Sequence, residues 1–278
     1  MNKDILLKRS CERIKGCIKH FLLNVAENKI TFTVSIIVTC VTLAVAVTTA
    51  LYHQFESTFV AVLSLILYLV PTASEEVLSI KLPTALETVL LLFIFCANIL
   101  GEIGEWYTRF AFLDDMLHGI SGFLFAAVGI SLIALFGRYV TKGIAFSPIF
   151  AALIALCFAV TVGVVWEFFE FSCDILLHTD MQKDCIIESI HSAHLNTHGQ
   201  APKAIADIAT TLVTSENGTY TAIDGYLDIG LWDTMQDLFI DFFGALVFCA
   251  LFCFSKRFPT AKILAEQFIP QITPTSNQ

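Results

Sequence analysis

The stretch FLDDMLHGISGFLFAAVGISLIALF, residues Phe112–Phe136, decides the fold. It opens with Asp114, Asp115 and His118 and then continues to its end without another ionisable residue. A helix needs about 20 apolar residues to cross roughly 30 Å of bilayer hydrocarbon. This stretch therefore predicts a membrane-spanning helix that carries ionisable groups at one end.

Further apolar stretches of similar length lie on both sides of it and predict five more spans. In chain order, the six predicted spans are Ile30–Leu51, Ser57–Thr72, Thr84–Gly101, Phe112–Phe136, Ile144–Cys173 and Leu231–Phe254. The second span is short and the fifth is long, so we expect tilt or a protruding helix end. The predicted fold class is an all-α polytopic membrane helix bundle with six transmembrane helices.

The composition agrees with residence in a membrane. Of the 278 residues, 56% are hydrophobic and 15% are charged, whereas an ordinary soluble domain is about 25% charged. This excludes a soluble globular domain, and it excludes a disordered chain because so apolar a sequence cannot stay solvated. The net charge of −9 gives no positive field over the molecule, so we expect no nucleic-acid partner.

The positions of the cysteines do not indicate a disulfide framework of the kind found in secreted proteins. Five of the nine cysteines fall inside apolar stretches, where cysteine packs as a small hydrophobe. Cys173 and Cys185 remain as the one pair that could form a disulfide.

Basic residues in the short flanks predict the orientation. They lie before the first span, between the fourth and fifth spans, and after the sixth. These three segments share one side of the membrane if the spans alternate, and the positive-inside rule makes that side cytoplasmic. We therefore expect a multi-pass membrane protein with both termini in the cytoplasm.

The predicted spans divide the chain into a membrane domain and two terminal segments. Residues 1–29 place apolar residues at three- and four-residue steps among lysines and arginines, which predicts a cytoplasmic amphipathic helix on an anionic membrane surface. Residues 30–254 form the six-span transmembrane domain, and residues 255–278 form a cytoplasmic tail. The polar residues 174–230, between the fifth and sixth spans, predict an extracytoplasmic cap.

Ionisable side chains inside spans cost about 2.5 to 3.5 kcal/mol each at mid-helix, so their positions are informative. In the predicted topology they gather at the outer ends of three spans, in the strings FLDDMLHGISG, WEFFEFSCD and LWDTMQDLFIDFFGA. The residues concerned are Asp114, His118, Glu167, Glu170, Asp174, Asp233, Asp237 and Asp241.

Their spacing aligns these side chains on one face of each helix. Residues four apart on a helix differ by about 40°, so Asp233, Asp237 and Asp241 form one stripe, and Asp114 lies one turn from His118. Facing lipid would leave carboxylates in hydrocarbon, so we expect all three stripes to turn toward a common interior or water-filled cavity. Asp114, Asp174 and Asp233 would lie near the rim and His118, Glu167 and Asp241 deepest, with Glu170 and Asp237 between.

Neighbouring carboxylates raise one another's pKa, so protons or cations must neutralise the group. A group of several carboxylates and one imidazole resembles the metal sites that face the interior of helical bundles. The predicted ligands of a divalent ion (Mg²⁺, Mn²⁺, Ca²⁺ or Zn²⁺) are Asp114, His118, Glu167, Glu170, Asp174, Asp233, Asp237 and Asp241. Helix N-termini alone would explain Asp114 and Asp233, but they do not explain the residues deeper in the spans.

Three functions fit this pattern. The first is a metal-dependent hydrolase or phosphotransferase acting on a membrane lipid or a lipid-linked envelope substrate, with His118 and Glu170 as catalytic residues. The second is a cation or proton-coupled transporter, although the apolar inner halves of the spans favour a one-sided pocket. The third is a non-catalytic membrane module with a structural metal site.

Five strings together carry a family resemblance: L-P before the third span, L-G-E near its end, D-x-x-x-H-x-x-S-G, W-E-x-x-E-x-x-x-D and D-T-M-x-D-x-x-x-D-x-x-G-A. They resemble those of the YjdF-like bacterial inner-membrane proteins and, more distantly, the VanZ-like proteins associated with glycopeptide resistance. The resemblance covers about Lys81 to Phe254 apart from the cap. It implies a bacterial cytoplasmic membrane and a polar motif set at the ligand positions named above.

Overall fold

The computed structural model describes residues 29–78, 80–110, 112–139, 146–196, 199 and 201–272 of the chain. The predicted amphipathic helix before Lys29 and the last residues of the predicted tail lie outside the described residues.

The predicted all-α membrane bundle is confirmed for the described part of the chain. Six helical segments there are long and apolar enough to cross a membrane by length and composition. They are Lys29–Leu51, Phe55–Glu75, Thr84–Ile103, Phe112–Gly137, Pro148–Leu177 and Leu231–Ser255.

The fifth segment differs most from its predicted range of Ile144–Cys173. Its helix begins at Pro148, where proline is favoured because its missing N–H has no helical partner to lose. The Ser147 hydroxyl accepts a hydrogen bond from the Phe150 amide (3.2 Å) and so caps this end. The helix continues to Leu177, one turn beyond the predicted end.

The helices are distributed along the chain as follows. The first membrane segment is a single helix, and the second joins two, namely α2 (Lys29–Leu51), α3 (Phe55–Leu67) and α4 (Val70–Leu78). The third changes from an α-helix to a π-helix and is followed by a short helix: α5 (Thr84–Ile94), η1 (Phe95–Ile103) and α6 (Trp106–Arg109). The remaining helices are α7 (Phe112–Tyr139), α8 (Pro148–Leu177), α9 (Leu231–Ser255) and α10 (Pro259–Glu266).

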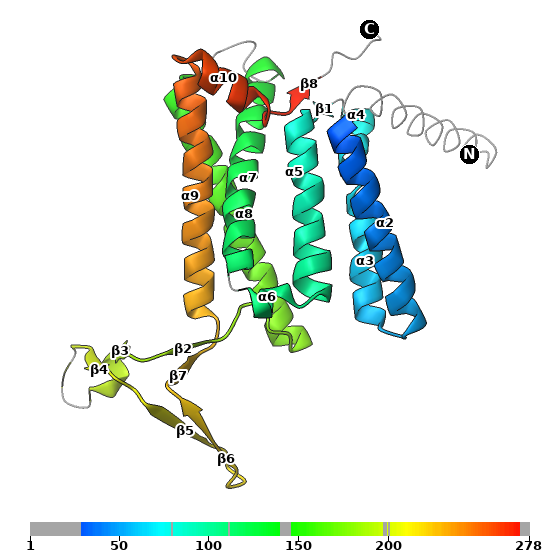
Figure 1. Ribbon diagram of the computed structural model, residues 1–278. Coiled ribbons are helices and arrows are strands. Elements are labelled where there is room, and N and C mark those ends of the chain that lie inside the picture. The colour runs from blue at the N-terminus through cyan, green and yellow to red at the C-terminus, as the bar shows by residue number, and fades with distance from the viewer. Residues whose placement is uncertain are drawn as a thin grey trace, which may run out of the picture. The chain divides into compact units, whose positions relative to one another are not determined.

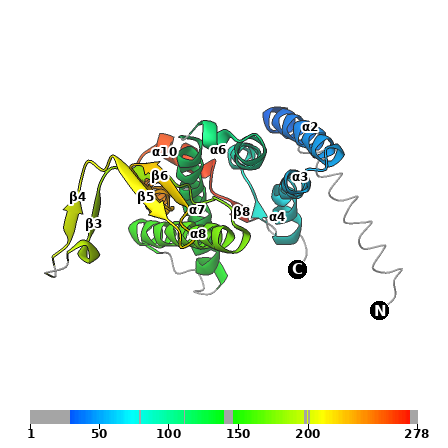
Figure 2. The same ribbon diagram turned by 90° about the horizontal axis from the view of Figure 1, so that it is seen from below.

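The chain divides into two compact units, Met1–Thr161 with Ile240–Gln278, and Val162–Phe239. Both boundaries fall within helices, so α8 and α9 each contribute to both units. In the first unit, α2, α3, α5 and α7 run side by side (Figure 1). Figure 2 shows α2 directly beside α3, to which it is joined by a short turn.

Hydroxyl and amide groups link the first helices of this unit. Thr31 of α2 and Thr88 of α5 share a hydrogen bond of 2.7 Å, and the Asn98 amide of η1 donates to Ser64 of α3 at 3.0 Å. Such bonds hold membrane helices together where the hydrophobic effect between them is weak.

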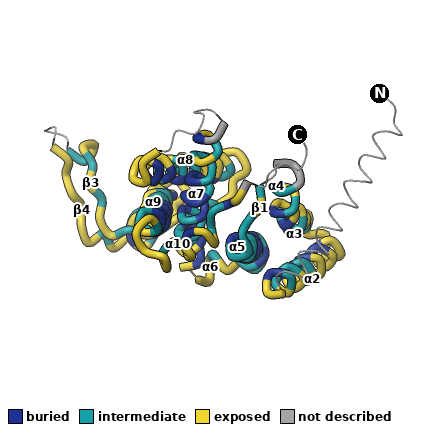
Figure 3. Tube along the Cα trace, turned by 90° about the horizontal axis from the view of Figure 1, so that it is seen from above, coloured by how far each residue is buried: buried dark blue, intermediate teal, exposed yellow. Residues whose placement is uncertain are grey.

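The apolar core of the first unit lies where α7, α8 and α9 meet. Alanines supply many of its buried positions, among them Ala126, Ala155 and Ala245, and their small size lets the helices approach closely. The Phe123 ring packs edge-on against Phe248 of α9, with ring centroids 5.0 Å apart. Exposed residues of α2, yellow in Figure 3, include large apolar side chains such as Ile37, as lipid-facing helices require.

The chain following α10 returns to the first half of the sequence. Strand β8 (Gln271–Ile272) pairs antiparallel with β1 (Ile80–Lys81), which lies between α4 and α5 (Figure 1). The Ser131 hydroxyl of α7 donates to the Pro270 carbonyl oxygen at 3.3 Å.

The predicted cap belongs to the second unit, and it contains short strands that its sequence did not predict. Three antiparallel pairs form there: β2 (Cys185–Ile187) with β7 (Tyr226–Asp228), β3 (Ile190–Ser192) with β4 (Lys203–Ile205), and β5 (Thr210–Thr214) with β6 (Tyr220–Asp224). A short 3₁₀ turn, η2 (Ala193–Leu195), follows β3. Cys173 and Cys185 are both free, so no disulfide joins them.

Candidate functional site

The start of α7 places two candidate residues on one side of the helix. Asp114 and Asp115 lie in its first turn, where the helix dipole favours negative charge. His118 follows one turn after Asp114, and its Nε2 atom lies 3.9 Å from Asp114 Oδ1. The predicted stacking of these two side chains is therefore present in the structure.

Glycines bring α7 and α9 into backbone contact beside His118. A Cβ atom at Gly122 would lie 2.1 Å from the carbonyl oxygen of Asp241. A Cβ atom at Gly244 would lie 2.1 Å from the carbonyl oxygen of Gly119. Only residues without a side chain permit this approach, which carries Asp241 of α9 to the side chains of α7.

Asp241 contacts two residues of α7. Its Oδ2 atom lies 3.4 Å from His118 Nδ1. Its Oδ1 atom accepts a hydrogen bond of 2.5 Å from the Ser121 hydroxyl, which also lies 2.8 Å from the carbonyl oxygen of His118. His118 is 6% exposed and Asp241 is 3% exposed, so this contact is strengthened by the low local dielectric.

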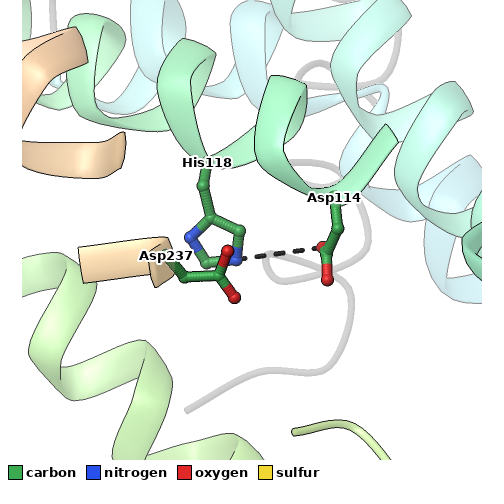
Figure 4. A group of neighbouring side chains, drawn as sticks. All are labelled: Asp114, His118 and Asp237. Atoms are coloured by element: carbon green, nitrogen blue, oxygen red, sulfur yellow. Dashed lines mark ion pairs between the residues drawn. The ribbon is translucent and has the colours of Figure 1, made fainter. Parts of the chain in front are cut away.

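Asp237 precedes Asp241 by one turn on α9 and is 2% exposed. Among the described residues, Asp114, His118 and Asp237 form a group in which one ligand atom of each lies within 4.8 Å of the others. Figure 4 shows the Asp237 carboxylate beside the imidazole, with Asp114 on the Nε2 side of the ring.

The donor set of this group fits a divalent cation. Bonds of about 2.0 to 2.6 Å from an ion to oxygen or nitrogen place its ligand atoms at most about 4 to 5 Å apart. The separations within the group fall inside that range. Two carboxylates and one imidazole are ligand types that divalent metals accept in helical bundles.

Glu167 and Glu170 of α8 belong to the second unit, and both are buried. The Trp166 indole N–H donates to Glu170 Oε1 at 2.9 Å, which holds one carboxylate oxygen in place. Their roles as metal ligands, and the catalytic role of Glu170, stay predictions.

Asp174 and Asp233, also in the second unit, hold the chain that follows α8. Asp174 accepts hydrogen bonds from the Thr179 hydroxyl and from two backbone amides, those of Met181 (2.7 Å) and Gln182 (2.8 Å). Asp233 accepts one from the Lys183 amide at 2.8 Å. These bonds give both carboxylates a structural task that their spacing did not reveal, and their roles as metal ligands stay predictions.

The exposure of the eight candidates agrees with the predicted rim residues but not with the predicted order below the rim, because Asp237, expected at intermediate depth, is the least exposed at 2%. Asp114, Asp174 and Asp233 are half-buried. The other five, His118, Glu167, Glu170, Asp237 and Asp241, are buried.

The sequence interpretation missed Ser121 and the glycines of the helix contact. Their signal was present in the string D-x-x-x-H-x-x-S-G, where Ser121 lies three residues after His118 and Gly122 lies four after it. A small residue at such a spacing marks the face that packs against another membrane helix.

Comparison with known proteins defines the family. A family described as "Predicted membrane protein (DUF2238)" matches residues 33–257, a range that contains most of the described helices and every candidate residue. No curated protein and no solved structure matches the chain. The chain belongs to the DUF2238 family of membrane proteins.

Proposed function

We propose that this membrane protein binds a divalent metal ion through Asp114, His118 and Asp237, and that Asp241 orients His118. One observation carries the proposal. The buried imidazole lies between two carboxylates, with Nδ1 3.4 Å from Asp241 and Nε2 3.9 Å from Asp114. Histidines that bind metals usually donate their other ring N–H to a carboxylate or carbonyl in this way.

The proposal assigns one tautomer to His118. A proton on Nδ1 that is donated to Asp241 leaves the lone pair of Nε2 directed toward Asp114. The Ser121 hydroxyl holds the second oxygen of Asp241, so the carboxylate cannot easily rotate away. In this proposal Asp241 leaves the predicted ligand set and becomes a support for the ring.

The ligand types bear on the choice of metal. Carboxylates suit Mg²⁺, Ca²⁺ and Mn²⁺, whereas imidazole suits Zn²⁺ and other transition metals. A site with two carboxylates and one imidazole therefore favours Mn²⁺ or Zn²⁺ over Mg²⁺ and Ca²⁺.

We further propose that the site is that of a hydrolase or phosphotransferase whose substrate is a lipid or a lipid-linked envelope compound. A bound divalent ion would polarise a phosphoryl or carbonyl oxygen of the substrate and lower the pKa of a water molecule. Both ring nitrogens of His118 face carboxylates, so in this proposal the transfer of protons would fall to Glu170, the second catalytic residue that the sequence predicts. The burial of the site within helices long enough to cross a membrane supports a lipidic substrate.

Transport is less well supported. Beyond the site, the buried residues of α7 and α9 are apolar, including Ala126, Ile130, Ala245 and Phe248. A path for cations or protons needs polar groups at such positions. The pattern supports a pocket closed at its inner end.

The resemblance to YjdF-like and VanZ-like proteins supports a bacterial cytoplasmic membrane as the location and the cell envelope as the setting. The distribution of basic residues supports cytoplasmic termini and an extracytoplasmic cap. Labelling of single cysteines with a membrane-impermeant reagent tests this orientation, and labelling of the cap from the cytoplasmic side would reverse it.

Equilibrium binding tests the metal centre. The purified full-length chain is stripped with a chelator and titrated with Mn²⁺ or Zn²⁺ by calorimetry. The variants Asp114→Asn, His118→Gln and Asp237→Asn should each lose most of the binding, whereas Asp224→Asn, on the exposed strand β6, should keep it. Absence of binding by the unaltered chain would reject the metal centre.

Activity is tested separately. Metal-loaded protein is incubated with a polyprenyl diphosphate or a phospholipid, and released phosphate is measured. Glu170→Gln should reduce turnover and keep the metal. Metal binding without turnover would favour the non-catalytic module, and ion flux into liposomes would favour the transporter.

A further inference from the structure

A cavity of about 280 Å³ lies at the end of α9 opposite to the candidate metal site. Ser255, the last residue of α9, is 14 residues from Asp241, which corresponds to about 20 Å along a helix. The cavity is therefore separate from the metal centre. Its floor is apolar and buried, and includes Phe252 and Ala265.

The rim of the cavity is polar and positively charged. It contains Ser255, Lys256, Lys262 and Glu266. Lys256 lies in the short turn between α9 and α10, with its ammonium nitrogen 4.6 Å from the centre of the Phe252 ring. The Lys262 ammonium lies 3.8 Å from a Glu266 oxygen, but both side chains are more than half exposed, and such exposed pairs are weak.

Charge at this end of α9 has the opposite sign to that of the whole protein. The chain carries a net charge of −9, yet the residues that line this cavity include two lysines, Lys256 and Lys262, and one carboxylate, Glu266. The cavity rim thus has an excess of positive charge over an apolar floor, which complements a ligand with an anionic group and an apolar body.

The length of α9 indicates which ligand the cavity would meet. Helix α9 is 25 residues long and is apolar enough to cross the bilayer, and a helix that does so would bring its last turn to the level of the lipid headgroups. Helix α10, which follows across this end of α9 in Figure 1, exposes the apolar side chains of Ile263 and Leu264. An amphipathic helix of this kind lies in the membrane interface.

We propose that the cavity between α9 and α10 binds the phosphate group of an anionic phospholipid. Lys256 and Lys262 supply the charge, because lysine binds phosphate as a point charge. The Ser255 hydroxyl lies at the same rim and donates its proton to the Phe252 carbonyl oxygen at 2.6 Å, so its oxygen can accept a hydrogen bond from a headgroup hydroxyl but not from the phosphate. Basic pockets at the ends of transmembrane helices recognise lipid headgroups in this way.

The cavity volume agrees with a headgroup. Sites for drug-sized ligands have volumes of about 300 to 1,000 Å³, and this cavity lies just below that range. It can take a phosphate and part of its glycerol, while the acyl chains remain along the exposed apolar surface of the helices.

Binding of short-chain lipids to the full-length protein in a neutral detergent tests the proposal. Phosphatidylglycerol, phosphatidylcholine and inorganic phosphate are compared by native mass spectrometry and by the shift of the thermal unfolding midpoint. Phosphatidylglycerol should bind in preference to phosphatidylcholine, and inorganic phosphate should not displace it. Equal binding of the two lipids, or binding of inorganic phosphate as tight as that of phosphatidylglycerol, would overturn the proposal.

Four variants locate the binding. Lys256→Gln and Lys262→Gln should each weaken phosphatidylglycerol binding about fivefold. Glu266→Gln should strengthen it, because it removes the one negative charge at the rim. Arg257→Gln removes the same charge from a neighbouring residue that does not line the cavity, so binding should change less than twofold. An equal loss in Arg257→Gln and in the two lysine variants would show a diffuse surface attraction and would overturn the proposal.

Discussion

Asp241 Oδ2 lies 3.4 Å from Nδ1 of His118, although 123 positions separate the two residues in the chain. The contact depends on Gly122 and Gly244, whose missing side chains let α7 and α9 meet at the backbone. In the proposed function, the Nδ1 proton is donated to Asp241, which leaves Nε2 as the nitrogen available to a metal ion. The packing of α7 and α9 would then set the tautomer of His118.

Asp241→Asn should lower the affinity for Mn²⁺ about 10- to 100-fold while the capacity stays at one ion per chain. The asparagine amide can donate a hydrogen bond to Nδ1 and so favour the tautomer that carries its proton on Nε2. A protonated Nε2 has no lone pair with which to bind the metal. Calorimetric titration measures both affinity and capacity. Asp224→Asn serves as the control, and an unchanged affinity in Asp241→Asn would contradict the orienting role.

Ser121→Ala should destabilise the protein by about 1 to 3 kcal/mol, because a buried carboxylate oxygen of Asp241 loses its donor. Denaturation of the detergent-solubilised protein measures the change. Ser172→Ala removes a hydroxyl that is exposed and donates to the Phe168 carbonyl of its own helix. This second variant should change stability by less than about 0.5 kcal/mol. Equal loss of stability in the two variants would contradict a stabilising hydrogen bond between Ser121 and Asp241.

Gly122→Ala should destabilise the protein by about 3 kcal/mol or more, since its Cβ would lie 2.1 Å from the Asp241 carbonyl oxygen and the helices would have to separate. Gly119→Ala is a matched control on the same helix. Its Cβ would meet a side-chain atom of Ile240 at 3.4 Å, an ordinary contact. Thermal unfolding and metal affinity should therefore change in Gly122→Ala and stay close to the original values in Gly119→Ala.

Cys185 in β2 should react slowly with iodoacetamide near neutral pH. Burial raises the pKa of its thiol, and the carboxylates of Asp228, Asp233 and Asp184 raise it further. A raised pKa means less reactive thiolate at a given pH, so the rate should reach half its maximum at a higher pH than in the denatured chain. Peptide mass mapping follows this residue specifically, and Asp228→Asn should move the midpoint down. A midpoint in the folded chain at or below that of the denatured chain would contradict the expectation.

The sequence predicted the spans and which candidate residues lie at the rim, because both follow from hydropathy and helical spacing. Asp114 and His118 were aligned correctly since one turn of a single helix fixes them. The distinct place of Asp241, beside Nδ1 and outside the Asp114–His118–Asp237 group, depends on how two helices pack. Spacing along one helix does not contain that information.

The hydrogen bonds of Asp174 and the strands of the cap could not be predicted from the sequence, for a related reason. Asp174 accepts hydrogen bonds from amides at residues 181 and 182, and such bonds depend on the path of an irregular segment. The strands of the cap are three to five residues long, too short for an alternating pattern to be distinguished from a polar loop.

Electron spin echo spectroscopy of the Mn²⁺-loaded protein tests the central claim most directly, because it detects a nitrogen atom bonded to the metal. We expect one ion per chain, with a nitrogen coupling from a single histidine that disappears in His118→Gln and persists in Asp224→Asn. Bound Mn²⁺ without a nitrogen coupling, or a coupling that survives in His118→Gln, would contradict the account.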